Sequence, residues 1–324
     1  MKKLSIKTVA VVGTGVIGRS WIPVFARAGC TVRVFDPNPE MALAAMEWFR
    51  NDLRSLRDQG KIKKKEAKAR FGRVTLTETL EAALKGVGYV QESGPERPDI
   101  KNAMYLEIDR AAPAKAILGS STSALDMTII AQGVPGAHRC IVAHPVNPPH
   151  VVPAVEILGG ASTDKKVIAR TVTFMRELGQ TPVVMKKFVP GFVLNRMQAA
   201  LIREAVDLVA SGVCDVEGVD AAIRDGLGLR WALMGPFGVA NTNADGGLRE
   251  YFTKYGGAYH AIWADLNTAR QFDAELIDRL GRETDSMMNA TLEAQRQWRD
   301  RLVAGIRELR ATTPLPAKRR KQKR

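Results

Sequence analysis

The sequence is poor in cysteine, with only Cys30, Cys140 and Cys214 among 324 residues. An odd, widely spaced set argues against a disulfide scaffold, matches no metal-ligand spacing and favours a reducing compartment. The chain also lacks the run of about 18 apolar residues that a membrane-spanning helix needs. Its apolar N-terminal run is followed by no small-residue cleavage site. These absences argue against secreted and membrane proteins, so we expect a cytoplasmic protein with no metal and no membrane partner.

Aromatic residues are also few, at 6%. The net charge of +14 raises the question of a nucleic-acid partner. Six of the positive charges lie in the last seven residues, Lys318 to Arg324, and a second basic cluster runs from Lys61 to Arg73. Neither cluster has the aromatic interleaving or the recognisable module of a nucleic-acid binder. We interpret both as solvated charge, with attraction of an anionic substrate or of coenzyme phosphates as the functional alternative. No nucleic-acid partner is expected.

Residues 7–36 carry the strongest local signal for a function. Val9 to Val12 form an apolar, β-branched run, which predicts a parallel strand buried on both faces. A helical pattern follows, and a second expected strand, residues 31–35, leads into Asp36. Between the first strand and the helix stand three glycines in the spacing G-x-G-x-x-G: Gly13, Gly15 and Gly18. Glycines in this context, with an acid about 20 residues further on, are typical of a dinucleotide-binding unit.

Each of these residues has a defined task in such a unit. Gly13 permits the tight turn, Gly15 lets the backbone approach the pyrophosphate, and Gly18 lets helix and strand come close. The helix N-terminus faces the phosphates. Asp36 can accept hydrogen bonds from both ribose hydroxyls of NAD and would repel the 2′-phosphate of NADP. The sequence therefore predicts NAD as the cofactor; a glycine turn of purely structural use is the alternative.

The rest of the chain alternates between strands and helices to about residue 187 and is helical beyond it. Its length allows two domains, and 45% hydrophobic with 25% charged residues is typical of a globular protein. We predict an α/β fold: a Rossmann-type, doubly wound, mainly parallel sheet over residues 1–187, followed by an all-helical domain over 188–311. A long helix is expected over 190–212, and a disordered basic tail over 312–324. Further strands are expected at 74–76, 89–91, 117–119, 140–143, 151–157 and 181–185.

Polar residues follow two of the expected strands at the edge where such sheets bind their ligands. Glu92 and Glu96 follow the strand at 89–91, and Lys101 lies one turn into the next expected helix. Four hydroxyl residues in a row, 120 to 123, follow the strand at 117–119. Because the carboxyl ends of parallel strands face the ligand crevice, these side chains are candidates for cofactor or substrate contacts. Capping of the helices that follow is the alternative.

A histidine and a glutamate stand on either side of a proline-rich loop. His144 ends one expected strand and Glu156 lies in the next, and the three prolines between them argue against a helix there. Such a loop would hold the imidazole against the carboxylate. The carboxylate would fix the tautomer and favour the imidazolium that forms when His144 takes a proton. Taken alone, a buried histidine satisfied by hydrogen bonding explains the pair as well.

Five motifs give the chain a resemblance to the 3-hydroxyacyl-CoA dehydrogenase superfamily, and within it to the lambda-crystallin or L-gulonate 3-dehydrogenase branch. They occur in the family's order over most of residues 7–260, and the resemblance is expected to fade beyond Tyr259. The motifs are GTGVIGRSW (13–21), SSTSAL (120–125), CIVAHPVNPP with PAVEI (140–149 and 153–157), PGFVLNR (190–196) and GLGLRWALMGP (226–236). The resemblance implies an NAD-dependent dehydrogenase whose helical domain pairs with its copy in a homodimer.

The resemblance also implies a role for each residue that matches a family motif. His144 resembles the base that removes the proton from the substrate's 3-hydroxyl, and Glu156 resembles its carboxylate partner. Ser123 resembles the serine that hydrogen-bonds the substrate oxygen, and Asn195 the asparagine that positions substrate and histidine. Five positions match the family's NAD contacts: Val16, Ile17, Asp36, Glu96 and Lys101.

One segment departs from the pattern of the acyl-CoA members. The residues Leu229 to Ala232 stand between the glycines and the sequence Met-Gly-Pro-Phe, and a similar insert occurs in gulonate and carnitine dehydrogenases, whose substrates are free carboxylates. A guanidinium fork binds a carboxylate bidentately and is poorly used on a thioester. Our hypothesis is that Arg230 binds the carboxylate of a small 3-hydroxy acid, and a structural ion pair is the alternative.

Four functions stay open on the sequence alone. The first is NAD-dependent oxidation of a small 3-hydroxy acid, similar to L-gulonate or carnitine, to the 3-keto acid. The second is oxidation of an L-3-hydroxyacyl-CoA such as 3-hydroxybutyryl-CoA, with the basic cluster at 61–73 meeting the coenzyme A phosphates. A non-enzymatic structural protein, like the lens crystallin, is the third, and the intact set of four catalytic matches argues against it. A nucleic-acid binder, suggested by the tail, is the fourth.

Overall fold

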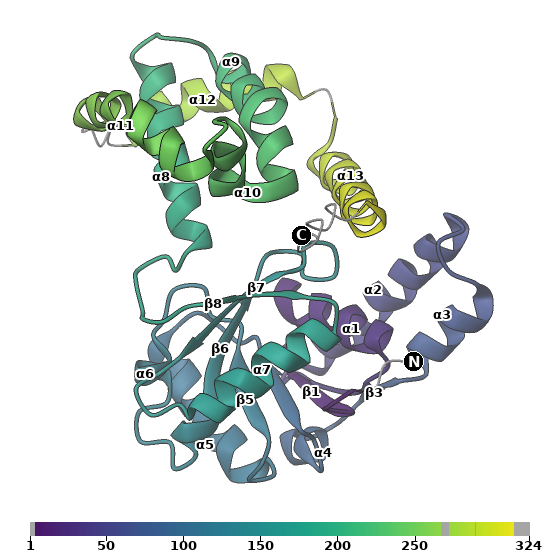
Figure 1. Cartoon of the computed structure of the whole chain (residues 1–324). Helices are drawn as coiled ribbons and strands as arrows, with labels where there is room; N and C mark the ends of the chain where they lie inside the picture. The colour runs from purple at the N-terminus through teal and green to yellow at the C-terminus, as the bar shows by residue number, and fades with distance from the viewer. Residues whose placement is uncertain (1–3, 267–271, 289, 314–324) are drawn as a thin grey trace, which may run out of the picture. The chain divides into compact units, whose positions relative to one another are not determined.

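One sheet of eight strands organises the first part of the chain (Figure 1). Its strands are β1 (Thr8–Val12), β2 (Thr31–Phe35), β3 (Val74–Leu76), β4 (Tyr89–Glu92), β5 (Ile117–Ser120), β6 (Cys140–Pro145), β7 (Ala154–Gly159) and β8 (Thr181–Val184). Their order is β3-β2-β1-β4-β5-β6-β7-β8, and every neighbouring pair is parallel except β6 and β7. The chain leaves β1 toward β2 and returns on its other side with β4. A ligand crevice is therefore expected beyond the carboxyl ends of β1 and β4.

The structure, a computed structural model, describes residues 4–266, 272–288 and 290–313. It divides into two compact units, Met1–Leu194 and Asn195–Arg324. Helices cover both faces of the sheet in the first unit. They are α1 (Val16–Ala28), α2 (Pro39–Asp58), α3 (Lys64–Phe71), α4 (Leu80–Leu84), α5 (Pro98–Ala111), α6 (Met127–Ile130), the 3₁₀ turn η1 (Ala137–Arg139) and α7 (Lys165–Glu177). The predicted mainly parallel α/β sheet, followed by a helical region, is confirmed.

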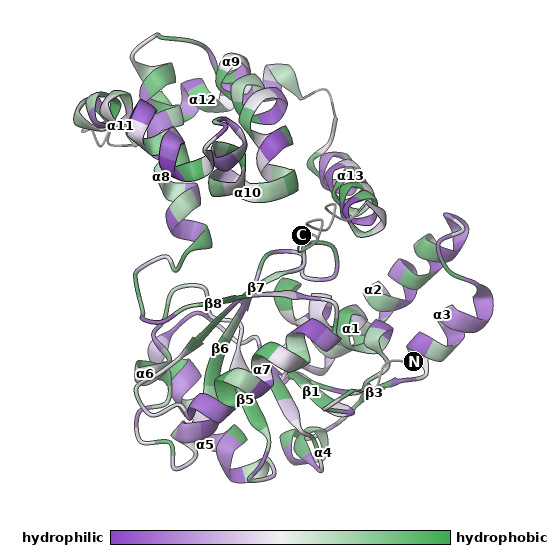
Figure 2. Cartoon of the chain, viewed as in Figure 1, coloured by the Kyte–Doolittle hydropathy of each residue, from purple (hydrophilic) through white to green (hydrophobic). Residues whose placement is uncertain are grey.

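The strand β1 shows why the inner strands are mostly apolar. Val9 and Val11 face one hydrophobic cluster with α1, α2 and α7, whereas Ala10 and Val12 face a second with α4, α5 and α6. Because successive side chains of a strand point to opposite faces, a strand covered on both sides is expected to be apolar on both faces. Figure 2 shows the contrast with α3, which is hydrophilic along most of its length and has no buried residue.

The second unit is built from helices wherever the structure describes it. They are α8 (Leu194–Ala210), α9 (Val216–Ala221), the π-helical turn η2 (Ala222–Leu227), α10 (Gly228–Thr242), α11 (Gly247–Asp265), α12 (Ala274–Met287) and α13 (Leu292–Thr312). Gly235, with a φ of 73°, and Pro236 bend α10. Among the described helices of both units, none combines the length and the apolar character that crossing a membrane requires.

The long helix expected over 190–212 is shorter than predicted, because α8 begins at Leu194. Gly191 and Phe192 have φ values of 76° and 50°, which a right-handed helix does not allow. At the other end, the N–H of Gly212 donates to the carbonyl of Val209 at 3.1 Å. The N–H of Val213 donates to the carbonyl of Leu208 at 2.9 Å. These bonds and the positive φ of Gly212 form a Schellman ending, which closes the helix before the glycine.

Two further expectations need correction. The strand expected over 151–157 begins only at Ala154, because the N–H groups of Val151 and Val152 donate to the carbonyl of Pro148 in a turn. The expected tail, 312–324, is wrong at its first residue, because α13 continues to Thr312. The basic residues 318–324 lie outside the described residues.

Candidate active site

The glycine turn between β1 and α1 has the shape that a dinucleotide needs. Gly13 has a φ of 87°, and a Cβ there would lie 2.8 Å from the carbonyl oxygen of Ser93. A Cβ on Gly18 would lie 1.9 Å from the carbonyl oxygen of Gly13, so helix and strand touch backbone to backbone. A Cβ on Gly15 would meet nothing within 4 Å. The outer glycines are therefore required by close approach, and the middle one leaves the backbone open to a ligand.

Asp36 directly follows β2, and its carboxylate is oriented toward this turn. Its Oδ2 accepts from the backbone N–H and the hydroxyl of Thr14, at 2.6 and 2.7 Å, and its Oδ1 accepts from the N–H of Asn38 at 2.9 Å. Val16, in the first turn of α1, is 55% exposed, and the adjacent Ile17 is partly buried. A carboxylate oxygen can accept more than one hydrogen bond, so Asp36 can still receive ribose hydroxyls. The turn and Asp36 together fit NAD.

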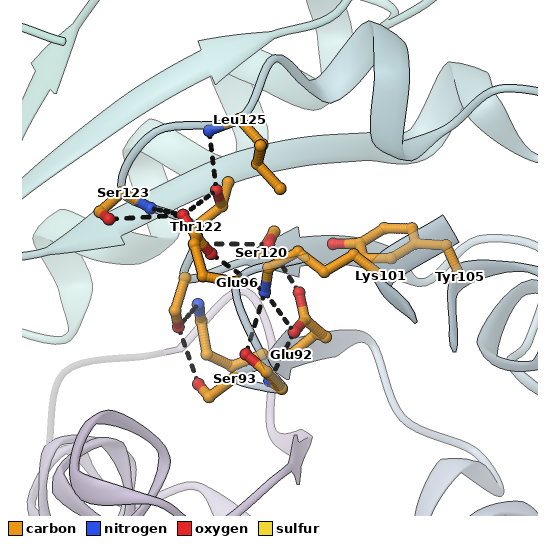
Figure 3. A network of polar contacts seen from close by, with 12 residues as sticks. Glu92, Ser93, Glu96, Lys101, Tyr105, Ser120, Thr122, Ser123 and Leu125 are labelled. Carbon is orange, nitrogen blue, oxygen red and sulfur yellow. Dashed lines mark hydrogen bonds and ion pairs between the residues drawn. The ribbon is translucent and has the colours of Figure 1, made fainter. Parts of the chain in front are cut away.

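A buried ion pair joins α5 to the end of β4, and its carboxylate also holds the end of β5 (Figure 3). The Nζ of Lys101 lies 2.7 Å from Oε1 of Glu92, and both side chains are 1% exposed. Oε2 of Glu92 accepts from the hydroxyl of Ser120 at 2.6 Å, while Lys101 also donates to the carbonyl of Gly94 at 3.2 Å. The structure thus places Lys101, which the resemblance assigns to the cofactor, inside the protein rather than on its surface.

Glu96 holds the hydroxyl-rich segment after β5 (Figure 3). Its Oε1 accepts from the hydroxyl of Thr122 at 2.6 Å, from the backbone N–H groups of Ser123 and Ala124 at 2.8 and 3.1 Å, and from the Ser123 hydroxyl at 3.3 Å. Burial alone would raise the pKa of Glu96, but these hydrogen bonds and nearby Lys101 outweigh burial and lower it. The side chain remains 39% exposed. Two candidate residues, Glu96 and Ser123, are therefore brought into contact.

His144 and Glu156 meet because β6 and β7 are antiparallel and the two residues are directly opposite in register. The Nδ1 of His144 lies 2.8 Å from Oε2 of Glu156. The other oxygen, Oε1, accepts from the backbone N–H groups of Val193 and Leu194 at 2.7 and 2.9 Å. Since an ionised carboxylate only accepts, Nδ1 carries the proton and Nε2 of the neutral ring presents a lone pair. The pair can therefore act as a base.

The same contacts set the charge of Glu156. Burial would raise its pKa, but the hydrogen bonds from His144 and from the N–H groups of Leu194 and Val193 outweigh burial and hold the pKa below its ordinary value of 4.5. At neutral pH the Glu156 carboxylate is charged, and the imidazolium formed at His144 would face a fixed negative charge.

These lowered pKa values predict a loss of stability in acid. A carboxyl group whose folded pKa lies below its unfolded pKa stabilises the fold above the unfolded value, and this contribution disappears as the pH falls through the folded value. We expect the free energy of unfolding, measured in urea, to decrease from about pH 5 downward. The Glu156→Gln variant should show a shallower decrease, because it has no proton to gain at that position. Parallel pH profiles for the two proteins would contradict this assignment.

Phe192 supports the imidazole, although the sequence analysis did not single it out. Its ring is fully buried and lies edge-on to His144, with centroids 5.7 Å apart, and edge-on to Phe188 at 6.1 Å. Phe192 has a φ of 50°, and no other non-glycine residue that the structure describes has a positive φ. The available signal was its place between Gly191 and the helix start, within a motif used only for the resemblance.

Gln91 is a second functional neighbour that the sequence analysis passed over. It is buried in β4, where its Oε1 accepts from the hydroxyl of Tyr89 at 2.7 Å. Its Nε2 donates to the hydroxyl oxygen of Ser121 at 2.8 Å and to the carbonyl of Ala143 at 3.3 Å, next to His144. A single amide thus connects β5 and β6 near their carboxyl ends. A polar residue in an otherwise apolar strand was the signal that could have found it.

Asn195 and Arg230 belong to the second unit and are described there. Asn195 lies in the first turn of α8 and Arg230 in the first turn of α10, and both are exposed. The thiols of Cys30 and Cys140 lie in the first unit. Burial is the main cause that raises the pKa of each thiol to about 12. Neither thiol is a nucleophile at neutral pH.

Two family models match the chain. The model described as "3-hydroxyacyl-CoA dehydrogenase, NAD binding domain" matches residues 8–188, and "3-hydroxyacyl-CoA dehydrogenase, C-terminal domain" matches residues 191–283. The first match confirms the predicted NAD cofactor. The second extends past Tyr259, so the expectation that the resemblance fades there is wrong.

Known proteins resemble the chain over most of its length. Lambda-crystallin from Oryctolagus cuniculus is 33% identical over 306 residues, which cover 93% of this chain and 96% of the relative. L-carnitine dehydrogenase from Oceanobacillus iheyensis is 38% identical over 302 residues, covering 92% and 96%. Among solved structures, 5-formyl-3-hydroxy-2-methylpyridine 4-carboxylic acid 5-dehydrogenase, described as an NAD⁺-dependent dismutase, has a TM-score of 0.78 at 27% identity and covers 94% of this chain and 98% of its own.

Proposed function

The chain belongs to the 3-hydroxyacyl-CoA dehydrogenase family of NAD-dependent oxidoreductases, and we propose that it oxidises the 3-hydroxyl of a small, free 3-hydroxy acid to the 3-keto acid. A substrate similar to L-gulonate or carnitine is expected. The observation that supports this most is the 2.8 Å contact between His144 Nδ1 and Glu156 Oε2 at the carboxyl end of β6. It gives a base with a fixed tautomer at the edge of the sheet where a dinucleotide binds.

In this proposal the first unit holds the cofactor with the residues of its glycine turn and strand ends. When bound, NAD accepts the hydride that leaves carbon 3 of the substrate. Gly15 offers an open backbone to the pyrophosphate, and Asp36, oriented by Thr14, accepts the ribose hydroxyls. Glu96 contributes its partly exposed carboxylate to cofactor binding. Lys101 acts through Glu96, because its Nζ lies 3.6 Å from Oε2 of that residue and is otherwise enclosed.

The proton of the substrate's 3-hydroxyl goes to Nε2 of His144. Glu156 stabilises the resulting imidazolium through Nδ1, and Phe192 keeps the ring in place. The Ser123 hydroxyl turns away from Glu96, to which it donates at 3.3 Å, and donates a hydrogen bond to the same substrate oxygen, while its backbone N–H stays on Glu96 at 2.8 Å. Asn195 is proposed to hold the substrate as well.

Arg230 is proposed to select free acids over thioesters. The substrate named for the dehydrogenase in the solved structure is itself a carboxylic acid, and carnitine carries a free carboxylate. In this structure Arg230 is exposed, so its guanidinium is available for a bidentate contact with such a group.

The Arg230→Met variant is expected to raise KM for the hydroxy acid by about 10-fold to 100-fold, the range for a lost hydrogen bond to a charged group. Its kcat should change far less, because a carboxylate is charged in both the ground and the transition state. Initial rates with a panel of hydroxy acids would measure both parameters. Arg249→Met, which removes an exposed arginine of α11, is the matched control. An unchanged KM in Arg230→Met would refute the role.

Oxidation of an L-3-hydroxyacyl-CoA is the second candidate. The exposed lysines of α3 and of the connection between α2 and α3 favour it, since they could meet the phosphates of coenzyme A. They are Lys61, Lys63, Lys64, Lys65 and Lys68. Turnover of acetoacetyl-CoA that exceeds turnover of free acids would select this function over the first.

A homodimer is proposed for the second unit. Several of its apolar side chains are between 49% and 68% exposed: Met197, Ile202, Leu229, Leu233 and Phe237. Exposed apolar groups on this scale mark interaction surfaces. The family resemblance supports a second copy of this chain as the partner.

A further inference from the structure

Arg19 carries a positive charge beside the glycine turn and is not used by the proposed mechanism. Its Nε is buried and has no hydrogen-bond partner among the described residues. Its guanidinium carbon lies 5.2 Å from the centroid of the Trp48 ring. Buried donors in native proteins nearly always have an acceptor, so an unpartnered one indicates a missing ligand or solvent group.

The position of Arg19 on α1 directs it toward the open side of the turn. Its backbone N–H donates to the carbonyl of Gly15 at 2.9 Å, which makes the two residues neighbours one helical turn apart. Side chains four residues apart lie on one face, and helical side chains lean toward the N-terminus. The same Gly15 has no atom within 4 Å of a built Cβ. The guanidinium and the open glycine therefore share one side of the helix start.

Trp48, on α2, holds the guanidinium in this place. Its ring is in turn edge-on to His150, with centroids 5.4 Å apart, and the carbonyl of His150 accepts from Arg27 at 3.2 Å. A ring that covers the face of a guanidinium leaves the N–H groups at its edge free to donate. The stack thus fixes the charge and keeps its donors available.

We propose that Arg19 binds a phosphate oxygen of the cofactor's diphosphate, as a side-chain contact added to the backbone groups of the glycine turn. The ligand class follows from the place: the start of α1 is where such a fold accepts phosphates, and a guanidinium edge matches their oxygens. The proposal depends on NAD binding alone. It is independent of His144 and of the identity of the hydroxy acid.

The test compares three ligands by calorimetry on the full-length protein: NAD, ADP-ribose and adenosine. Arg19→Met should raise Kd for NAD and for ADP-ribose by about 10-fold or more, the factor for a charge-assisted hydrogen bond. Kd for adenosine, which lacks phosphate, should stay within about twofold. The matched control is Arg50→Met, because Arg50 also stacks on a ring, 5.1 Å from the centroid of Phe71, without lying near the turn.

Three results would overturn the proposal. The first is an unchanged Kd for NAD in Arg19→Met, and the second is an equal loss for adenosine, which would mean general damage to the pocket. The third is a loss for NAD without a loss for ADP-ribose, which would assign Arg19 to the nicotinamide half of the cofactor and not to the diphosphate. If Arg19→Met does not fold, as judged by circular dichroism, Arg19→Lys carries the same comparison. It keeps the charge and loses the fork, so a smaller rise for the two phosphate ligands is expected.

Discussion

The His144→Gln variant is expected to oxidise its hydroxy acid more slowly by a factor on the order of 10² to 10⁴, the usual contribution of a general base. Glutamine can still hydrogen-bond Glu156, but it cannot take a proton. Binding of NAD should stay within about twofold, because the glycine turn and Asp36 make no contact with the imidazole. The loss should therefore appear in kcat and in kcat/KM together.

Rates of NADH formation and calorimetric Kd values would test this directly. His138→Gln is the matched control, since His138 is exposed on η1 and should not affect the rate. Adding Glu156→Gln to His144→Gln should cost little more than the first substitution, because Glu156 acts on the chemistry through the imidazole. A His144→Gln protein that turns over at more than about one tenth of the normal rate would remove His144 from the role of base.

Much of the first unit could be predicted because its elements are specified locally. The strands expected at 31–35 and 74–76 are β2 and β3 with the same bounds. The helix expected after the hydroxyl residues 120–123 is α6, where the Asp126 carboxylate accepts from the N–H of Thr128 at 2.8 Å. A strand covered on both faces is mostly apolar, and a helix start favours a short acceptor side chain. Both rules can be read from neighbouring residues.

The remaining features depend on contacts between distant segments. Phe192 leaves the helical conformation where Glu156, from another element, accepts the N–H groups of the two residues that follow it. Nothing local in the pattern of 190–212 indicates that acceptor. Likewise, the position of Lys101 one turn into α5 gives no sign that Glu92 encloses it. The candidate residues and the contact between His144 and Glu156 could be named from the sequence, but the partners of Glu156 at the start of α8 and of Lys101 could not.

The Lys101→Met variant is expected to lose about 3 to 5 kcal/mol of unfolding free energy, the cost of leaving one charge of a buried pair without its partner. Glu92 would keep the hydroxyl of Ser120 and the N–H of Gly94, at 2.6 and 2.5 Å, but no cation would contact Oε1. For a folding unit of 150–250 residues, this corresponds to a melting temperature lower by roughly 6 to 20 °C. Lys115→Met, at an exposed lysine, is the control and should change little.

The double variant Lys101→Met, Glu92→Gln separates a structural pair from a direct cofactor contact. Removing both charges leaves no uncompensated ion in the interior, so the double variant should be more stable in urea than Lys101→Met alone. A lysine that contacted NAD directly would behave differently: its loss would raise Kd for NAD and leave the stability of the unliganded protein intact. Equal stability of the single variant and the unchanged protein would therefore refute the buried role. Glu92 also accepts hydrogen bonds from Ser120 and Gly94. If Lys101 acts only through this buried pair, Lys101→Met should raise Kd for NAD only to the extent that the segments carrying Ser120 and Gly94 become disordered.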